Sequence, residues 1–407
     1  MLKLIRKYKT TVLILFILGA LFRLGYNSYL GWDRPLIGDE QRYYKLAKSL
    51  AENHNYLDNG QPSTQMPGTS LILAFFFTFF GASPIIGKII ISLSSALIAP
   101  LTFLFAQKFQ GKYLPAVLSG FWMAVYPYFL HQSTMMDSEN FFIPLFIFFL
   151  FYLLDLKVKN ISIKLVIWGG LLWGALALIR PNAFYLTFFL LIWLFCFQDK
   201  LLQYAKEKLK ISAIFLAGFI LVLAPWTIRN YVHFSKFIPT NTDAMEILLA
   251  SHNERTFTDP IVAGNYLGLY DVIGSKKYDA MSDTARKDYL IRTFKKHWYR
   301  FPWLAIQKLK WFWHFSPKHP YHRNLRDDLV GLFSYGIFIP FMIWGFWSNR
   351  RNKKYQFLLW LIFYFSLMTV ATYGCTRLRL PLDPFLIMVA FIEIVRLLPK
   401  NIQKRFN

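Results

Sequence analysis

The sequence has little charge, few cysteines and few acidic residues. Only 17% of its 407 residues are charged, whereas an average soluble domain has roughly a quarter, so a soluble single-core enzyme is not expected. Two cysteines exclude a disulfide-rich scaffold, and 21 Gly with 19 Pro are too few for a fibrous chain. Disordered chains have low hydrophobicity, but 55% of these residues are hydrophobic and 19% are aromatic. The class of protein that remains is a membrane protein with many membrane-spanning segments.

Apolar stretches long enough to cross a bilayer recur along the whole chain, since a spanning helix needs about 20 mostly apolar residues. Ten are expected, near 11–30, 85–107, 113–131, 140–156, 164–180, 183–198, 211–228, 329–347, 356–373 and 383–398. A further apolar run over 69–81 is short for a span and is expected as an interfacial or re-entrant helix. The sequence therefore predicts an all-α polytopic membrane protein with about ten transmembrane helices plus interfacial helices.

Positive charge exceeds negative charge, with 46 Lys and Arg against 22 Asp and Glu. An excess of basic residues can indicate a protein that binds nucleic acid. Here the basic clusters are short and lie in separate loops, so no nucleic-acid partner is expected. With ten spans, six basic segments share one side: 3–9, 108–112, 157–164, 200–210, 350–354 and 396–405. The positive-inside rule makes that side cytoplasmic. We expect a plasma-membrane protein with both termini in the cytoplasm, and abundant Lys, Asn, Ile and Phe favour a bacterial source.

Most acidic residues fall on the opposite, outer side, in the loops over 31–68 and 132–139 and in the long polar segment 229–328. That segment has about 100 residues and is expected to form an outer-face domain. The chain then divides into an N-terminal transmembrane module over 1–228, the outer domain over 229–328 and C-terminal transmembrane helices over 329–407. Chemistry that uses carboxylates is expected on the outer face.

Asp39 and Glu40 stand in the first outer loop, between Gly38 and Tyr43. An acidic residue at a helix start caps free amides and meets the positive end of the helix dipole, so a structural cap is one interpretation. The other is a general base, an ionised carboxylate held close to the membrane surface. Adjacent helical residues point in different directions, so the two acids need not share one role. Both are candidate catalytic residues.

A second pair of acids, Asp137 and Glu139, opens the fourth expected span. Helix capping is again the structural interpretation. The functional interpretation is a second carboxylate that faces Asp39 across an outer cavity and binds the acceptor or a divalent metal ion. The sequence does not decide which of the two acids faces the cavity, and no other cofactor is expected.

Four arginines stand at the outer ends of expected spans: Arg180, Arg229, Arg377 and Arg379. Contact with membrane phospholipids by snorkelling explains one or two of them. Four at a similar depth indicate a designated anion, and the planar guanidinium binds phosphate through two parallel hydrogen bonds. A lipid phosphate at the bilayer surface fits this placement.

These residues lie in motifs that follow one another in a recognisable order. The motifs are Gly38-Asp39-Glu40, Met66-Pro67-Gly68, Ser138-Glu139, Leu178-Ile179-Arg180-Pro181, Pro225-Trp226-Thr227-Ile228-Arg229-Asn230-Tyr231 and Arg377-Leu378-Arg379-Leu380-Pro381. From about residue 10 to residue 395, the set resembles the C-type (GT-C) glycosyltransferases, above all protein O-mannosyltransferases and lipid A aminoarabinose transferases. Leu378 departs from the family, which often has an aromatic residue between these arginines.

The resemblance implies an inverting glycosyltransferase with a polyprenyl-phosphate sugar donor, whose sugar is a hexose or a pentose. Asp39 would deprotonate an acceptor hydroxyl that attacks C1 of the sugar, on a glycan, a lipid or a protein. The four arginines would hold the donor phosphate, and Glu139, or its rival Asp137, would be the second acid.

A transporter or flippase of lipid-linked sugars is the alternative function. Transporters have broken helices and polar groups near the middle of the membrane. The mid-span positions of this chain are mostly apolar, and its polar residues cluster at the outer span ends. That distribution favours chemistry at the membrane surface.

Overall fold

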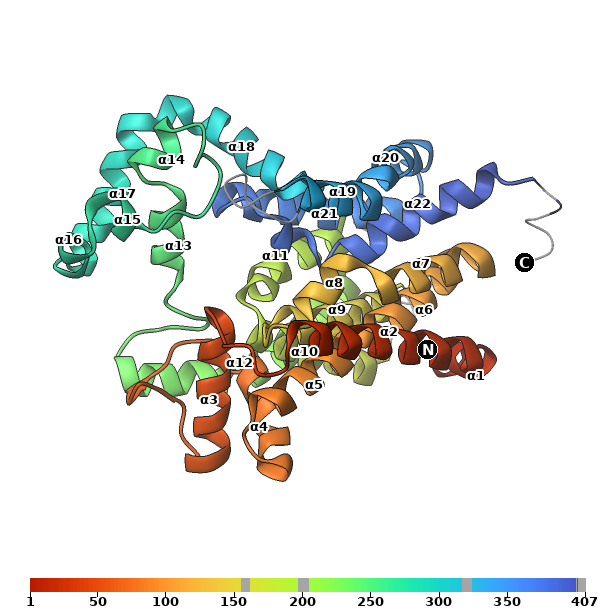
Figure 1. Ribbon diagram of the computed structural model, residues 1–407, viewed down its shortest axis with the longest axis horizontal. Helices are drawn as coiled ribbons and strands as arrows, with labels where there is room; N and C mark the ends of the chain where they lie inside the picture. Colours follow the sequence, from red (N-terminus) through yellow and green to blue (C-terminus); the bar gives the residue numbers. More distant parts are fainter. Residues whose placement is uncertain (155–161, 197–204, 317–323, 400, 402–407) are drawn as a thin grey trace. The chain divides into compact units, whose positions relative to one another are not determined.

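The computed structural model describes residues 1–154, 162–196, 205–316, 324–399 and 401 (Figure 1). The chain is 78% helical, which confirms the all-α polytopic membrane class predicted from the sequence. By packing it separates into two compact units. The first comprises Met1–Asn241, Phe338–Phe357 and Pro384–Asn407, and the second Thr242–Ile337 and Leu358–Asp383. The functional division expected at residues 228 and 328 stays a prediction.

The first unit contains most of the apolar helices. Its elements are α1 (Leu2–Lys7), α2 (Lys9–Leu30), α3 (Asp39–Asn53), α4 (Gly68–Phe80), α5 (Pro84–Ala96), α6 (Ile98–Gln110), α7 (Tyr113–Val125), α8 (Pro127–Gln132), α9 (Glu139–Leu153), α10 (Ile163–Ile179), α11 (Pro181–Cys196), α12 (Ala205–Phe234), α20 (Ile339–Ser348) and nearly all of α22 (Asp383–Leu397). The short strands β1 (Leu57–Asp58) and β2 (Gln61–Pro62) pair antiparallel in the loop after α3.

The second unit is built from shorter helices. They are α13 (Ala244–Ser251), α14 (Glu254–Thr258), α15 (Leu269–Ile273), α16 (Ser275–Asp279), α17 (Asp283–His297), η2 (Trp298–Arg300), α18 (Phe301–Trp313), α19 (Leu325–Ser334) and η5 (Thr376–Arg379). Most of α21 (Lys353–Ala371) also belongs to this unit. Its buried apolar centre consists of Phe257, Ala263 and Leu304, with Phe294, Phe301 and Trp303 packed against it.

Among the described residues, five helical stretches are long and apolar enough to cross a membrane: Lys9–Leu30, Pro84–Gln110 (α5 with α6), Ala205–Phe234, Leu325–Ser348 (α19 to α20) and Lys353–Ala371. Five shorter apolar helices accompany them: Gly68–Phe80, Tyr113–Val125, Glu139–Leu153, Ile163–Ile179 and Pro181–Trp193. The first of these is the helix expected over 69–81. The ends of the spans expected over 140–156 and 183–198 lie outside the described residues, as do parts of the basic loops that follow them.

The span expected over 113–131 is divided into α7 and α8 at Tyr126 and Pro127. Tyr126 has extended backbone angles, φ −62° and ψ 116°, as expected for a residue that precedes proline, because the proline ring disfavours the helical region there. Arg23 of α2 donates to the carbonyls of Met123 and Ala124 near the end of α7, at 3.2 Å each. This arginine inside a spanning helix therefore faces protein rather than lipid.

Close contacts between helices depend on glycine. A Cβ on Gly170 of α10 would lie 2.2 Å from the carbonyl oxygen of Phe215 in α12, and one on Gly218 would lie 2.9 Å from that of Ile167. Small residues at such positions let helix backbones approach closely in membrane proteins. The helices α3 and α4 also pack side by side (Figure 1), and α3 carries the first candidate acids.

A buried lysine and a histidine face each other in the second unit. The ammonium of Lys308 on α18 lies 2.7 Å from Nε2 of His252 and 3.0 Å from the carbonyl oxygen of Val370. Burial lowers the pKa of Lys308 to about 7. Burial, and then the Lys308 charge, lower the pKa of His252 to about 3, so its ring stays neutral and accepts the hydrogen bond.

The stability of the protein is therefore expected to rise between about pH 7 and pH 10.5. In that interval the unfolded chain holds a proton on Lys308 that the folded chain lacks, which gives a slope of up to about 1.4 kcal/mol per pH unit. Lys308→Met should remove this slope in unfolding titrations, whereas Lys310→Met, an exposed position on the same helix, should keep it. Equal slopes in the wild type and Lys308→Met would contradict this.

Candidate active site

Asp39 is the first residue of α3 and is exposed. Gly38 before it has φ of 56°, a conformation that glycine adopts without the steric cost of a side chain. Glu40 is 1% exposed and lies in the same first turn. The two adjacent acids therefore have opposite environments, and only Asp39 is open to an incoming molecule.

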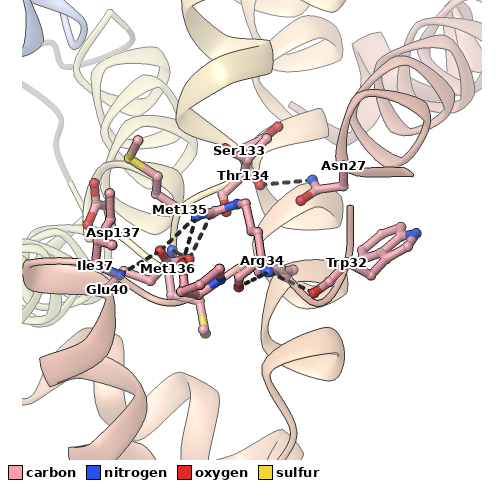
Figure 2. Close-up of polar contacts among 12 residues, drawn as sticks. Asn27, Trp32, Arg34, Ile37, Glu40, Ser133, Thr134, Met135, Met136 and Asp137 are labelled. Carbon is pink, nitrogen blue, oxygen red and sulfur yellow. Dashed lines mark hydrogen bonds and ion pairs between the residues drawn. The ribbon is translucent and has the colours of Figure 1, made fainter. Parts of the chain in front are cut away.

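Glu40 belongs to a hydrogen-bond network that joins the loop before α3 to the turn over 133–138 (Figure 2). Arg34 donates to Glu40 from both terminal guanidinium nitrogens, Nη2 at 2.9 Å and Nη1 at 3.2 Å, and also donates to the carbonyl of Thr134. The backbone amide of Met136 donates to Glu40 at 3.4 Å. Lys88 donates to the backbone carbonyl of Arg34 at 3.2 Å. Glu40 thus ties the first loop to the turn over 133–138, and its catalytic role stays a prediction from the sequence.

Asp137 is held inside that turn. Its side chain is 3% exposed and accepts a hydrogen bond from Nε2 of Gln132 at 2.8 Å. Asn140 reinforces the turn, since its side-chain amide donates to the carbonyls of Gln132 and Met135 at 2.9 and 3.0 Å. These contacts keep the turn in one conformation at the start of α9.

Glu139 and Arg180 form a buried ion pair of 2.9 Å between the start of α9 and the end of α10. The Glu139 side chain is 0% exposed and that of Arg180 is 11% exposed. The Arg180 guanidinium also lies 5.7 Å from the centre of the Phe142 ring. Breaking such a pair leaves one charge buried, so the two residues depend on each other.

Tyr43 connects the two candidate acids. It follows Asp39 by one helical turn, on the same face of α3, and its hydroxyl accepts a hydrogen bond from Gln65 at 2.8 Å. Burial, then the negative charges of Asp39 and Glu139, raise the pKa of Tyr43 to about 12, while hydrogen bonds from Ser138 and Gln65 oppose the rise. One neutral phenol therefore lies close to both carboxylates.

Arg229 of α12 is held by the first loop. It donates to the carbonyls of Ser63 and Tyr56 at 2.6 and 3.2 Å, and its guanidinium lies 5.1 Å from the Trp226 ring. These contacts join α12 to the chain on both sides of the β1–β2 hairpin.

Arg377 and Arg379 belong to the second unit, on η5. Arg379 is fully buried and forms an ion pair of 2.8 Å with Asp383. It also donates to the carbonyls of Phe312 and His314, at 3.2 and 2.7 Å. Arg377 is half-buried. Arg379 is thus committed to backbone and carboxylate contacts within its own unit.

The structure brings together some candidate residues and adds others. In the first unit, the charges of Asp39 and Glu139 both act on Tyr43. Arg180 joins this group through its ion pair with Glu139. Arg34 and Gln65 were missed by sequence reasoning. For Tyr43 a sequence signal exists: it follows Asp39 by four residues, a spacing that places both side chains on one face of a helix.

A divalent metal ion finds little support in these side chains. In the part of the chain that the structure describes, no group of three or more His, Cys, Asp or Glu residues is placed to hold one. Glu139 is paired with Arg180 and Asp137 with Gln132.

The fold is that of the GT-C glycosyltransferases, which confirms at the level of fold the resemblance read from the sequence. The solved structures it matches include the archaeal oligosaccharyltransferase AglB from Archaeoglobus fulgidus in complex with an inhibitory peptide and a dolichol-phosphate, at 13% identity and a TM-score of 0.58, covering 96% of this chain and 51% of that one. Another is ArnT from Cupriavidus metallidurans in the apo state, at 14% identity and a TM-score of 0.55, covering 98% and 62%. This chain therefore spans about half the length of AglB and less than two thirds of ArnT. No family model and no curated protein matches the sequence.

Proposed function

We propose that this chain is an inverting glycosyltransferase that moves a hexose or pentose from a polyprenyl-phosphate donor to an acceptor hydroxyl on the outer face of the membrane. One observation carries the proposal: on a GT-C fold, the charges of the exposed Asp39 and the buried Glu139 both act on Tyr43, and Glu139 is paired with Arg180. An ionised acid beside a fixed charge pair is an arrangement suited to proton removal and to stabilising a charged leaving group.

In the proposed reaction, Asp39 takes the proton from the acceptor hydroxyl as its oxygen attacks C1 of the sugar. A new C1–O bond forms, the bond from C1 to the phosphate oxygen breaks, and polyprenyl phosphate leaves with the bonding electrons. Because attack and departure take place on opposite faces of the ring, the configuration at C1 is inverted. Tyr43 stays protonated, since its pKa is raised to about 12, and it can donate a hydrogen bond beside the base.

Arg180 is the proposed phosphate ligand of the first unit. It is 11% exposed and it stands at the end of α10, where a guanidinium can contact a phosphate in the polar region of the bilayer. Glu139 fixes its orientation through the ion pair. Arg229 is proposed to support the site by holding the first loop through Ser63 and Tyr56. The assignments of Arg377 and Arg379 to the phosphate stay predictions from the sequence.

Turnover of lipid-linked sugars tests the function. The purified chain in liposomes should release free polyprenyl phosphate from at least one member of a panel of polyprenyl-phosphate hexoses and pentoses, in the presence of acceptor. The same preparations should show no movement of intact lipid-linked sugar between leaflets. Movement without release from any donor would instead establish the transporter alternative.

Cysteine labelling tests the side of the membrane. Asn59 and Asn352 are both exposed, and the positive-inside rule places the basic loop at Asn352 in the cytoplasm and the first loop outside. In a background with Cys196→Ser and Cys375→Ser, a membrane-impermeant maleimide should label Asn59→Cys in intact cells. It should label Asn352→Cys only after permeabilisation. The reverse pattern would overturn the proposed orientation.

A further inference from the structure

A groove of about 480 Å³ runs between α20 and α22 in the first unit. Its walls are formed by Pro340, Phe341, Trp344 and Ser348 from α20, and by Glu393, Arg396 and Leu397 from α22. On each helix these residues are spaced three or four apart, or adjacent, so each set occupies one face. The volume lies within the range of small-molecule sites, and none of these residues has a part in the proposed transfer.

The two helices touch below the groove. A Cβ on Gly345 of α20 would lie 2.5 Å from Val389 and 3.0 Å from Glu393 of α22. The absence of a side chain at Gly345 therefore lets the two helices approach closely next to the groove. The apolar wall is open, because Trp344 is 60% exposed and Leu397 is 74% exposed.

One end of the groove is polar and basic. The buried carboxylate of Glu393 accepts hydrogen bonds from Arg396 at 2.6 Å and from Asn349 at 3.2 Å. This contact ties the loop after α20 to the end of α22. Exposed bases follow: Arg350 and Arg351 in the same loop, and Lys353 and Lys354 at the start of α21. Glu393 is already paired, so the net charge at this end is positive.

We propose that this groove, named the α20–α22 groove, binds one anionic phospholipid. Its acyl chain lies against Phe341, Trp344 and Leu397, and its phosphate lies at the end that carries Arg350 and Arg396. From Pro340 to Ser348 the wall is about 12 Å long, at a rise of roughly 1.5 Å per residue. That is less than half of a hydrocarbon core of about 30 Å. The occupant is thus a lipid of one leaflet, and the positive-inside rule makes it the cytoplasmic leaflet.

Photolabelling tests the proposal on the full chain in nanodiscs. Phosphatidylglycerol with a diazirine in its acyl chain should label peptides of α20 and α22 at least about fivefold more than the matching phosphatidylcholine. Arg350→Gln and Arg396→Gln should each lower this preference about fivefold, which corresponds to about 1 kcal/mol for one base near the surface. Arg396→Gln leaves the hydrogen bond from Asn349 to Glu393 in place, so the contact between the end of α20 and α22 is kept. Arg6→Gln, at an exposed base of α1, should leave the preference unchanged.

A second variant separates groove binding from general attraction to anionic lipid. Ser348→Phe should occupy part of the groove and lower the labelling of α20 and α22 by both lipids, with an unchanged thermal unfolding midpoint. Equal labelling by the two lipids in the wild type, or unchanged labelling in Ser348→Phe, would overturn the proposal. So would displacement of the labelled phosphatidylglycerol by an equimolar amount of polyprenyl phosphate, because the occupant would then be that lipid. The result does not depend on whether the chain transfers a sugar.

Discussion

Asp39→Asn is expected to lower sugar transfer by about 10²–10⁴-fold, the contribution of a positioned general base. The substitution keeps the size of the side chain and removes its ability to accept the proton. Asp39 is exposed, so the folded structure should not suffer. The measurement is the initial rate of polyprenyl phosphate release in liposomes, together with the thermal unfolding midpoint of the same preparation.

Two neighbouring acids serve as controls for this variant. Asp33→Asn changes another exposed acid of the same loop and should leave the rate within about twofold of the wild type. Glu40→Gln removes the charge that holds Arg34, so it should lower the unfolding midpoint, unlike Asp39→Asn. A wild-type rate in folded Asp39→Asn would remove Asp39 as the base.

The transmembrane architecture could be predicted because it follows from composition and length. The apolar stretches of about 20 residues have no soluble alternative, and helices such as Lys9–Leu30 and Ala205–Phe234 bear this out. The short helix after Pro67 was predicted for the same reason. The break at Pro127 was missed, although a proline and the residue before it carry a local signal against a continuous helix.

The candidate site could be predicted only in part. Sequence patterns indicated Asp39, Glu40, Asp137 and Glu139 because these acids open helices in the expected outer loops, but the patterns could not separate an exposed acid from a buried one. Arg34 binds the carboxylate of Glu40 and also donates to the carbonyl of Thr134, so Glu40 is buried between the first loop and the turn over 133–138. That contact joins residues about a hundred positions apart, and no local spacing encodes it.

Contacts with residues distant in the sequence also distinguish the candidate arginines from one another. Arg180, Arg229 and Arg379 all stand at expected span ends, so the same role, binding of the donor phosphate, was predicted for each. In the structure, Arg180 and Arg379 each pair with a carboxylate, whereas Arg229 donates to backbone carbonyls of the first loop. Tertiary contacts, which a single sequence does not reveal, decide which guanidinium is available to a ligand.

Removing either member of the Glu139–Arg180 pair is expected to destabilise the protein strongly. Glu139→Gln or Arg180→Met should lower the free energy of unfolding by about 3–5 kcal/mol, because each leaves the other charge buried and unpaired. Unfolding titrations in mixed detergent micelles would measure this loss. As a matched comparison, Lys48 and Glu52 form an exposed pair of 3.9 Å on α3. Lys48→Met should change the free energy by about 0.5 kcal/mol or less.

The double variant Glu139→Leu/Arg180→Met separates stability from function. Replacing both members of a buried pair with apolar side chains of similar size is often neutral or stabilising, so the unfolding midpoint should return close to that of the wild type. Sugar transfer should nevertheless stay low, because the proposed phosphate ligand and the second acid are both gone. If the refolded double variant transferred sugar at the wild-type rate, the pair would be a structural feature of the α9–α10 contact, and the donor phosphate would have to be held by other residues.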